Sequence, residues 1–202
     1  MPSTYLHKNQ GTPTLATKFT VSCWFKRGIV DTEQRLFQGY KDSNNRFYCK
    51  FNTDNTLMIF AATGGADKVN WKTTMRFFDT TAWYHLVVVG DSTEGSAGDR
   101  LKIYVNGVNV DNKGGFTKTT NSIDSSMDWG IQLAQTNQTF TISGTESHSQ
   151  LFDGLMSHFH YVDGTAYQAS TFGSTDATTG EWKINTNPTL TMGTNGFTIL
   201  KD

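Results

Sequence analysis

Residues 82–108, AWYHLVVVGDSTEGSAGDRLKIYVNGV, restrict the possible folds more than any other part of the chain. The run WYHLVVV is apolar at odd and even positions, which is typical of a strand covered on both faces. Over Leu101–Val105 apolar and polar residues alternate, which predicts a strand with one buried face. Asn106-Gly107 then favours a two-residue hairpin turn, because both residue types tolerate positive φ. The stretch predicts a central strand, a long surface loop and a hairpin in one sheet.

Other segments show strand-like patterns, and none shows helical periodicity longer than about two turns. The strand candidates are FTVSCWFKRG (19–28), RFYCKFN (46–52), TLMIFAA (56–62), WGIQLAQ (129–135), QTFTISG (138–144), LMSHFHYV (155–162) and GFTILKD (196–202). The segments DTTAW (79–83) and TAYQAST (165–171) are candidates for short helical turns. This pattern predicts an all-β fold, a two-sheet antiparallel jelly-roll sandwich. We expect one domain over 1–202, in which 1–18 is an N-terminal segment and a candidate attachment arm.

Charge and hydropathy narrow the function classes. The formal net charge is −1, so no basic field exists that would attract nucleic acid or an anionic membrane. No apolar run reaches the ~18 residues of a membrane-spanning helix. The opening MPSTYLHKNQG has no apolar core of a secretory signal. We therefore expect neither nucleic acid nor membrane insertion among the interactions of this protein.

Cys23 and Cys49 are the two cysteines, and both lie in apolar strand-like runs. This setting favours two buried thiols, and a disulfide between neighbouring strands is the alternative. No CxxC pair is present, which argues against a thiolate metal site.

The acidic residues form no recognisable catalytic pattern. A glycosidase needs two carboxylates at about 5–10 Å from each other across the scissile bond. None of the glutamates has an acidic residue two positions away on an apolar strand, and their polar contexts indicate solvated surface carboxylates: Glu33, Glu94, Glu146 and Glu181. A GxSxG nucleophile elbow is also missing. The sequence predicts a protein that is not an enzyme and has no catalytic residues.

Four ordered motifs resemble the laminin-G-like branch of the concanavalin-A-like jelly roll: FTVSCWFKRG, AWYHLVVV, DRLKIYVNGV and FDGLMSHFHYVDG. The later segment YVDGTAYQASTFGSTDATTGEW, followed by GTNGF, resembles a laminin-G-like module of structural and tail-associated proteins of marine phages and environmental viruses. The resemblance implies a virion protein on the particle surface, in capsid decoration or a tail fibre. Its expected partners are other virion proteins, further copies of itself in a homo-oligomer, and host-surface glycans.

Two alternatives to this virion role remain, because the fold hosts many unrelated functions. The first is a carbohydrate-binding adhesin or receptor-binding module. The second is a glycoside hydrolase of the same fold that uses carboxylates without a sequence signature.

Metal binding is a further expectation. Many laminin-G-like domains hold Ca²⁺ in rim loops, and hard oxygen ligands in irregular loops suit this ion. The resemblance therefore implies Asp153 and Asp163 as calcium candidates, although Asp-Gly is first of all a turn signal. His158 and His160 are predicted on one face of a strand, as a metal-binding pair or as a solvent-facing pair. His85 is expected to be buried and hydrogen-bonded.

Tryptophans could form a sugar-binding platform, because flat indole rings stack on the apolar C–H faces of sugars. Trp24, Trp83 and Trp182 lie within the motifs above, so we interpret them as packing residues. Trp71 and Trp129 lie outside them and are the candidates for an exposed platform, with core packing as the alternative. The polar residues near them in sequence complete the candidate contact set for a carbohydrate or a partner: Asn70, Asp128, Gln132 and Asn137.

Overall fold

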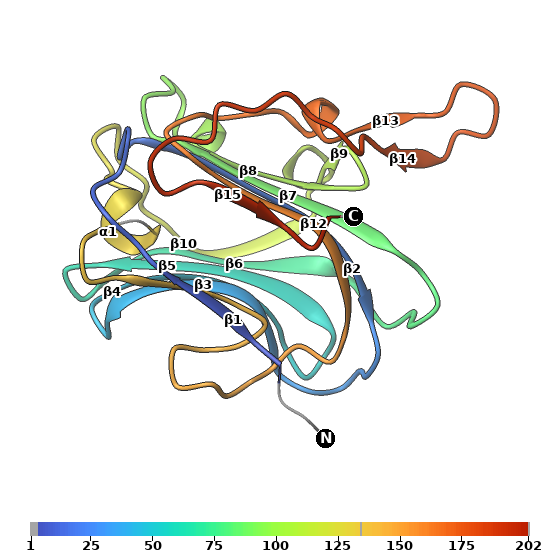
Figure 1. Ribbon diagram of the computed structural model, residues 1–202, viewed down its shortest axis with the longest axis horizontal. Helices are drawn as coiled ribbons and strands as arrows, with labels where there is room; N and C mark the ends of the chain where they lie inside the picture. Colours follow the sequence, from blue (N-terminus) through green and yellow to red (C-terminus); the bar gives the residue numbers. More distant parts are fainter. Residues whose placement is uncertain (1–3, 134, 202) are drawn as a thin grey trace.

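The computed structural model describes residues 4–133 and 135–201. Two large sheets face each other, and Figure 1 shows one as the lower and the other as the upper layer. Neighbouring strands run antiparallel in both layers, for example β3 with β4 and β2 with β7. The predicted all-β two-sheet sandwich is confirmed. Within the described residues, no helix is long and apolar enough to cross a membrane.

The lower sheet has seven strands in the order β1-β11-β3-β4-β5-β6-β10. Its strands are β1 (Leu6–Asn9), β3 (Gln34–Asp42), β4 (Asn45–Phe51), β5 (Thr56–Thr63), β6 (Ala66–Arg76), β10 (Phe116–Asn121) and β11 (Thr139–Ile142). The upper sheet has six strands in the order β15-β12-β2-β7-β8-β9. They are β2 (Lys18–Arg27), β7 (Tyr84–Asp91), β8 (Leu101–Val105), β9 (Val108–Asn109), β12 (Gly154–Asp163) and β15 (Phe197–Ile199).

A short hairpin of β13 (Gly173–Thr175) and β14 (Trp182–Ile184) projects beyond the upper sheet, at the right of Figure 1. The remaining elements are one helical turn, α1 (Gly130–Leu133), and three 3₁₀ turns: η1 (Ala97–Asp99), η2 (Asp111–Lys113) and η3 (Ala169–Thr171).

Strand alternation builds the core, because successive side chains point to opposite faces of a sheet. In β4 the inward set is Phe47, Cys49 and Phe51, all buried between the two sheets. Burial of each such phenylalanine stabilises the fold by about 1.5–3 kcal/mol. Cys23 of β2 is buried in the same core as Cys49, and both thiols are free. The expected buried thiols are confirmed; their strands belong to different sheets, so they are not neighbouring strands.

The Asn-Gly hairpin is confirmed, with φ of 48° at Asn106 and 77° at Gly107 between β8 and β9. One strand prediction is wrong, since residues 129–135 contain the helical turn α1. There the amide of Leu133 donates to the carbonyl of Trp129. Both side chains are buried, because residues four apart lie on one side of a helix. The helical turn expected in 165–171 is η3, whereas 79–83 forms none.

The two outer faces of the sandwich differ. Val87 and Val89 of β7 point away from the core and are buried against Ala169 and Phe172, which follow β12. Trp182 of β14 packs against the same cluster. The chain after β12 therefore lies over the upper sheet, as the orange and red trace shows in Figure 1. Over β3 and β4 of the lower sheet the outer face instead opens into a pocket.

Candidate functional site

A polar hollow on the lower sheet, hereafter the β3–β4 pocket, has a volume of about 320 Å³. It lies on the outer face of β3 and β4, beside the loop that joins β11 to β12. Its lining residues are Arg35, Gln38, Tyr40, Ser43, Arg46, Tyr48, Thr145, Glu146, Ser149 and Gln150.

Local strand geometry places these side chains outside. In β4, Arg46 and Tyr48 alternate with the buried core residues and so face outward. In β3 the register with β4 shifts between Arg35 and Phe37. Leu36 and Phe37 are consequently both buried in the core. Such a bulge re-aims the flanking side chains, and it turns Arg35 and Gln38 together into the pocket.

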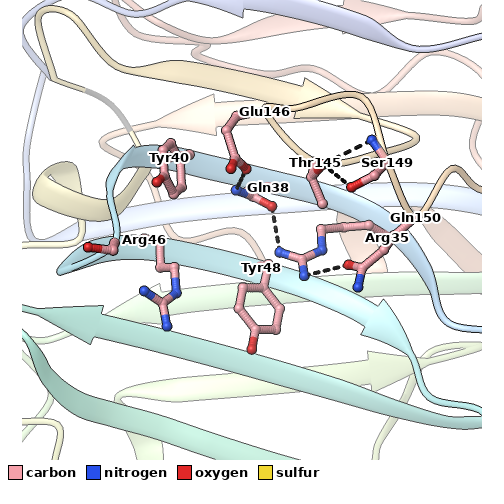
Figure 2. Close-up of a pocket in the computed structure, with 10 residues that line it drawn as sticks. Arg35, Gln38, Tyr40, Arg46, Tyr48, Thr145, Glu146, Ser149 and Gln150 are labelled. Carbon is pink, nitrogen blue, oxygen red and sulfur yellow. Dashed lines mark hydrogen bonds between the residues drawn. The ribbon is translucent and has the colours of Figure 1, made fainter.

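A chain of hydrogen bonds crosses the pocket and is drawn with dashed lines in Figure 2. The amide of Gln38 donates to Glu146 Oε2 at 2.6 Å, and its carbonyl accepts from Arg35 Nη1 at 2.5 Å. Arg35 Nη2 donates to Gln150 Oε1 at 2.8 Å. Beyond the pocket the amide of Gln150 donates to Glu33, which also pairs with Lys50. The donors and acceptors of the pocket are thus held in fixed directions.

Stacked rings form the other wall. The Arg35 guanidinium lies 3.9 Å from the centre of the Tyr48 ring, and this arginine is only 8% exposed. Burial lowers the pKa of Arg35 and raises the pKa of Tyr48. Tyr48 stacks on Phe60 at 4.8 Å, and Arg46 lies over the same Phe60 ring at 5.2 Å. Within the described residues, the Arg46 guanidinium donates no hydrogen bond, so its donors face the pocket unsaturated.

This arrangement suits a ligand that carries several hydroxyls and an apolar ring face. Amide, guanidinium and carboxylate groups offer donors and acceptors at fixed positions. Both faces of the Tyr48 ring are covered, by Arg35 and by Phe60, whereas the Tyr40 ring also lines the pocket and offers a flat surface. The two carboxylates of the network, Glu33 and Glu146, do not face each other, because Gln38, Arg35 and Gln150 are linked between them.

The expected indole platform is absent. Trp71 is 0% exposed and Trp129 is 1% exposed, so neither ring is available to a ligand. Trp71 sits on the inward register of β6, between its outward neighbours Asn70 and Lys72. Trp129 precedes α1 and packs edge-on against Phe19 of the core at 5.3 Å. The alternative of core packing is the correct one for both.

The polar residues expected near these tryptophans are dispersed and do not line the pocket. Asn70 is half-buried on β6, Asp128 is half-buried before α1, and Asn137 is exposed in a turn with φ of 66°. The side chain of Gln132 lies outside the described part of the structure.

Asp153 and Asp163 do not form one cation site. Asp153 precedes the first residue of β12 and Asp163 is its last residue, so they are about 30 Å apart at the usual rise per residue. Asp163 is 2% exposed, and its Oδ2 accepts from the backbone amides of Thr14 and Asn195 and from the Asn195 side chain. This carboxylate ties the N-terminal segment to the loop before β15. Over residues 4–133 and 135–201, no three His, Cys, Asp or Glu side chains group into a metal site.

The histidines differ from expectation in one respect. A β-bulge between Ser157 and His160 separates His158 from His160, so they are not a solvent-facing pair. His160 is buried and its Nδ1 bonds to Thr198 Oγ1 at 2.8 Å. His85 is buried and hydrogen-bonded as expected, to Ser22 Oγ and to the indole N–H of Trp182, both at 2.9 Å.

Sequence reasoning missed most of the pocket. It placed no strand over Gln34–Asp42, which supplies Arg35 and Gln38. The alternation of RFYCKF is a signal that could have placed Arg46 and Tyr48 on the outer face. Glu146 was interpreted as a solvated carboxylate, and only the tertiary structure brings it to Gln38, 108 residues away in sequence.

The sequence profile of the Laminin_G_3 family, described as the concanavalin A-like lectin/glucanases superfamily, matches residues 3–169. A heptameric SAP-like pentraxin from Limulus polyphemus aligns with a TM-score of 0.55 and 14% identity over 98% of this chain and 88% of its own. The NanB sialidase of Streptococcus pneumoniae aligns with a TM-score of 0.57 and 15% identity, over 88% of this chain and 30% of the sialidase.

A putative carbohydrate binding protein from Bacteroides ovatus has a TM-score of 0.50 and 14% identity, over 97% of this chain and 58% of its own. A search of the curated proteins finds no match. At these identities the solved structures share the fold, in a group that includes sugar-binding proteins, a pentraxin and a sialidase domain. By its sequence match and its two-sheet sandwich, the chain belongs to the concanavalin A-like lectin/glucanases superfamily.

Proposed function

We propose that this protein is a glycan-binding module and that its β3–β4 pocket holds the glycan. One observation carries the proposal: an uncovered pocket of about 320 Å³ combines a flat aromatic wall with fixed polar groups. A sugar ring would stack on Tyr40, and its hydroxyls would bond to Glu146 and the unsaturated donors of Arg46. Fixed partners lower the entropy cost of binding, because the network orders them in advance.

The module acts by binding and not by hydrolysis in this proposal. A glycosidase needs two carboxylates on either side of the scissile bond. Glu146 accepts a hydrogen bond from Gln38, and Glu33 is paired with Lys50 and Gln150, so both carboxylates are engaged in holding the pocket. Incubation with each bound glycan, followed by a reducing-sugar assay, should release no product; release that Glu146→Gln abolishes would contradict this part.

A glycan array followed by calorimetry tests the binding. Tyr40→Ala should weaken binding of each array hit by at least about tenfold, which equals about 1.4 kcal/mol. Lys72→Ala is the matched control: Lys72 lies on the outer face of the same sheet, pairs with Asp54 and does not line the pocket. An array without hits, or hits that bind Tyr40→Ala as tightly as the parent protein, would refute the proposal.

A second candidate role places this module on a virion surface, where it binds other virion proteins, further copies of itself and host-surface glycans. The segment that resembles phage structural proteins favours it. That segment covers β7 and forms the projecting β13–β14 hairpin. Mass spectrometry of purified particles, with a tagged copy of the chain, should find it bound to them. Its absence from particles would leave glycan binding as the function to be tested.

A further inference from the structure

A second hollow opens on the opposite side of the sandwich, at the uncovered end of the upper sheet. Its volume is about 230 Å³, and it is lined by Trp24, Trp83, Ser157, His158 and Ile184. We call it the Trp83 hollow. Trp83 immediately precedes β7 and is 40% exposed, so this indole has a free face. The sequence-based interpretation of Trp83 as a packing residue is therefore incorrect.

His158 enters this hollow through an unusual backbone. In β12, Ser157 pairs with Trp24 and His160 pairs with Ser22, which leaves an extra residue in the bulge between them. His158 has φ of 47°, a left-handed conformation that is uncommon for a residue other than glycine. Bulges re-aim side chains and often occur beside binding sites. Here the bulge sets His158 in the wall of the hollow, while the next two residues remain buried.

Two contacts fix the His158 ring. Its Nδ1 lies 2.6 Å from Ser157 Oγ, and its backbone amide donates to the carbonyl of Leu200 at 2.9 Å. The other ring nitrogen, Nε2, has no hydrogen-bond partner among the described residues. The hollow thus contains one polar atom that is held in place and unpaired.

The Trp24 part of the aromatic wall is equally fixed. Trp24 stacks on His85 with ring centres 4.8 Å apart and planes 13° apart, and His85 stacks on Trp182 at 6.0 Å and 17°. His85 is in turn held by its two hydrogen bonds. Rings fixed before binding lose little entropy when a ligand arrives.

We propose that the Trp83 hollow is a second saccharide site, which binds a neutral pyranoside. The apolar C–H face of the sugar lies on the exposed indole of Trp83, and a ring hydroxyl bonds to His158 Nε2. Apart from His158, the lining residues carry no charge, so the walls hold no lysine, arginine or carboxylate that would pair with a uronic acid or an amino sugar. A purely apolar ligand would leave the fixed nitrogen without a partner.

The site is independent of the β3–β4 pocket, because the two lie on opposite outer faces of the sandwich. The Tyr48 side chain points to the face of β4 opposite to its core residues, and the Trp24 side chain points to the face of β2 opposite to its core residues. Two sites that face apart cannot hold one short glycan together. They can bind two chains of a glycan-coated surface, and such bivalent attachment raises the avidity without new contacts.

Nuclear magnetic resonance of the full chain tests the proposal, with three probes: methyl β-D-glucopyranoside, methyl β-D-galactopyranoside and methyl α-D-mannopyranoside. At up to about 50 mM, above the millimolar Kd typical of such weak sites, at least one should shift the indole N–H of Trp83 and the ring signals of His158. Trp83→Ala should weaken this binding at least about tenfold. Phe78→Ala is the matched control, since Phe78 is an exposed aromatic residue outside the hollow.

Two further variants test the role of His158 and the independence of the two sites. His158→Asn should weaken binding at least about threefold with no loss of fold, because Asn tolerates positive φ but lacks the Nε2 donor or acceptor. Tyr40→Ala should leave these shifts unchanged, so failure here is distinct from failure at the β3–β4 pocket. The proposal is overturned if no probe moves the Trp83 signal, or if Trp83→Ala binds as well as Phe78→Ala. The proposal is also overturned if free indole displaces the sugar from the hollow and His158→Asn leaves sugar binding unchanged.

Discussion

Buried histidines should make the stability of this protein depend on pH below about 6.5. His85 is 0% exposed, and burial lowers its pKa from the ordinary 6.5 to about 3, with a smaller contribution from the nearby His160. The indole N–H of Trp182 donates to Nδ1, so the neutral ring carries its proton on Nε2 and donates to Ser22. Protonation of His85 Nδ1 would place its N–H donor against the indole N–H donor of Trp182.

The direction and size of this pH dependence follow from the difference between the pKa of His85 in the unfolded and in the folded protein. The unfolded chain takes up a proton near pH 6.5, whereas folded His85 does not until about pH 3. The contribution of neutral His85 to the free energy of unfolding is therefore complete above pH 6.5 and is lost as the pH falls toward 3. Between pH 7.5 and 5.0 the free energy of unfolding should fall by about 2 kcal/mol from His85 alone. Burial also lowers the pKa of His160, to about 4, which adds a fall of similar size.

Urea unfolding at pH 7.5, 6.5, 5.5 and 5.0, followed by circular dichroism, measures this slope. In His85→Asn the amide oxygen can still accept from Trp182, but nothing titrates, so about 2 kcal/mol of the pH dependence should disappear. Val87→Ala is the control, because Val87 is buried in the same strand and does not titrate, so its loss should lower the stability equally at all four pH values. Equal slopes in His85→Asn and the parent protein would refute the reasoning.

Three further predictions concern the core and the turns. Arg27→Met should lower the free energy of unfolding by about 2–4 kcal/mol in urea titrations, because the buried guanidinium donates two hydrogen bonds from Nη1 that have no substitute. Gly107→Ala should lower the free energy of unfolding by more than about 2 kcal/mol, measured by thermal unfolding, since a Cβ there meets the Trp182 ring at 2.3 Å and φ is 77°. Asn106→Gly, at the other turn position, should lower it far less. Cys23 and Cys49 should resist a thiol reagent at pH 8 and react in urea, since burial raises the pKa of Cys23 to about 12 and that of Cys49 well above its ordinary value; rapid labelling of the folded protein would contradict their burial.

Much of the fold could be predicted from local patterns. The apolar run before Gly90 is a central strand of the upper sheet, and Asn106-Gly107 forms the hairpin between β8 and β9, because alternation and positive φ are properties of a few adjacent residues. Residues 129–135 were misassigned because the apolar residues of WGIQLAQ fit both a strand and a single helical turn. Length and contacts decide between these, and here the carbonyl of Ala16 accepts from Gly130 at the start of the turn.

The candidate sites were less predictable, because they depend on contacts between distant segments. Trp71 and Trp83 illustrate the difficulty: in sequence the first looked exposed and the second buried, and the structure reverses both. A tryptophan is equally suited to a core and to a platform, so its residue type does not decide its exposure. The bulges at Arg35 and His158, which aim the two polar side chains outward, also have no glycine or proline at the inserted position to reveal them.

The sequence by itself determined the class of fold and which side chains of each strand face inward, since strand period and turn chemistry are encoded locally. Only the tertiary structure decided which outer face stays open, because that depends on where the chain after β12 comes to lie. It also joined Glu146 to Gln38 and placed Trp83 and His158 around one hollow. Such contacts arise from sheet order and strand register, which no short stretch of residues specifies.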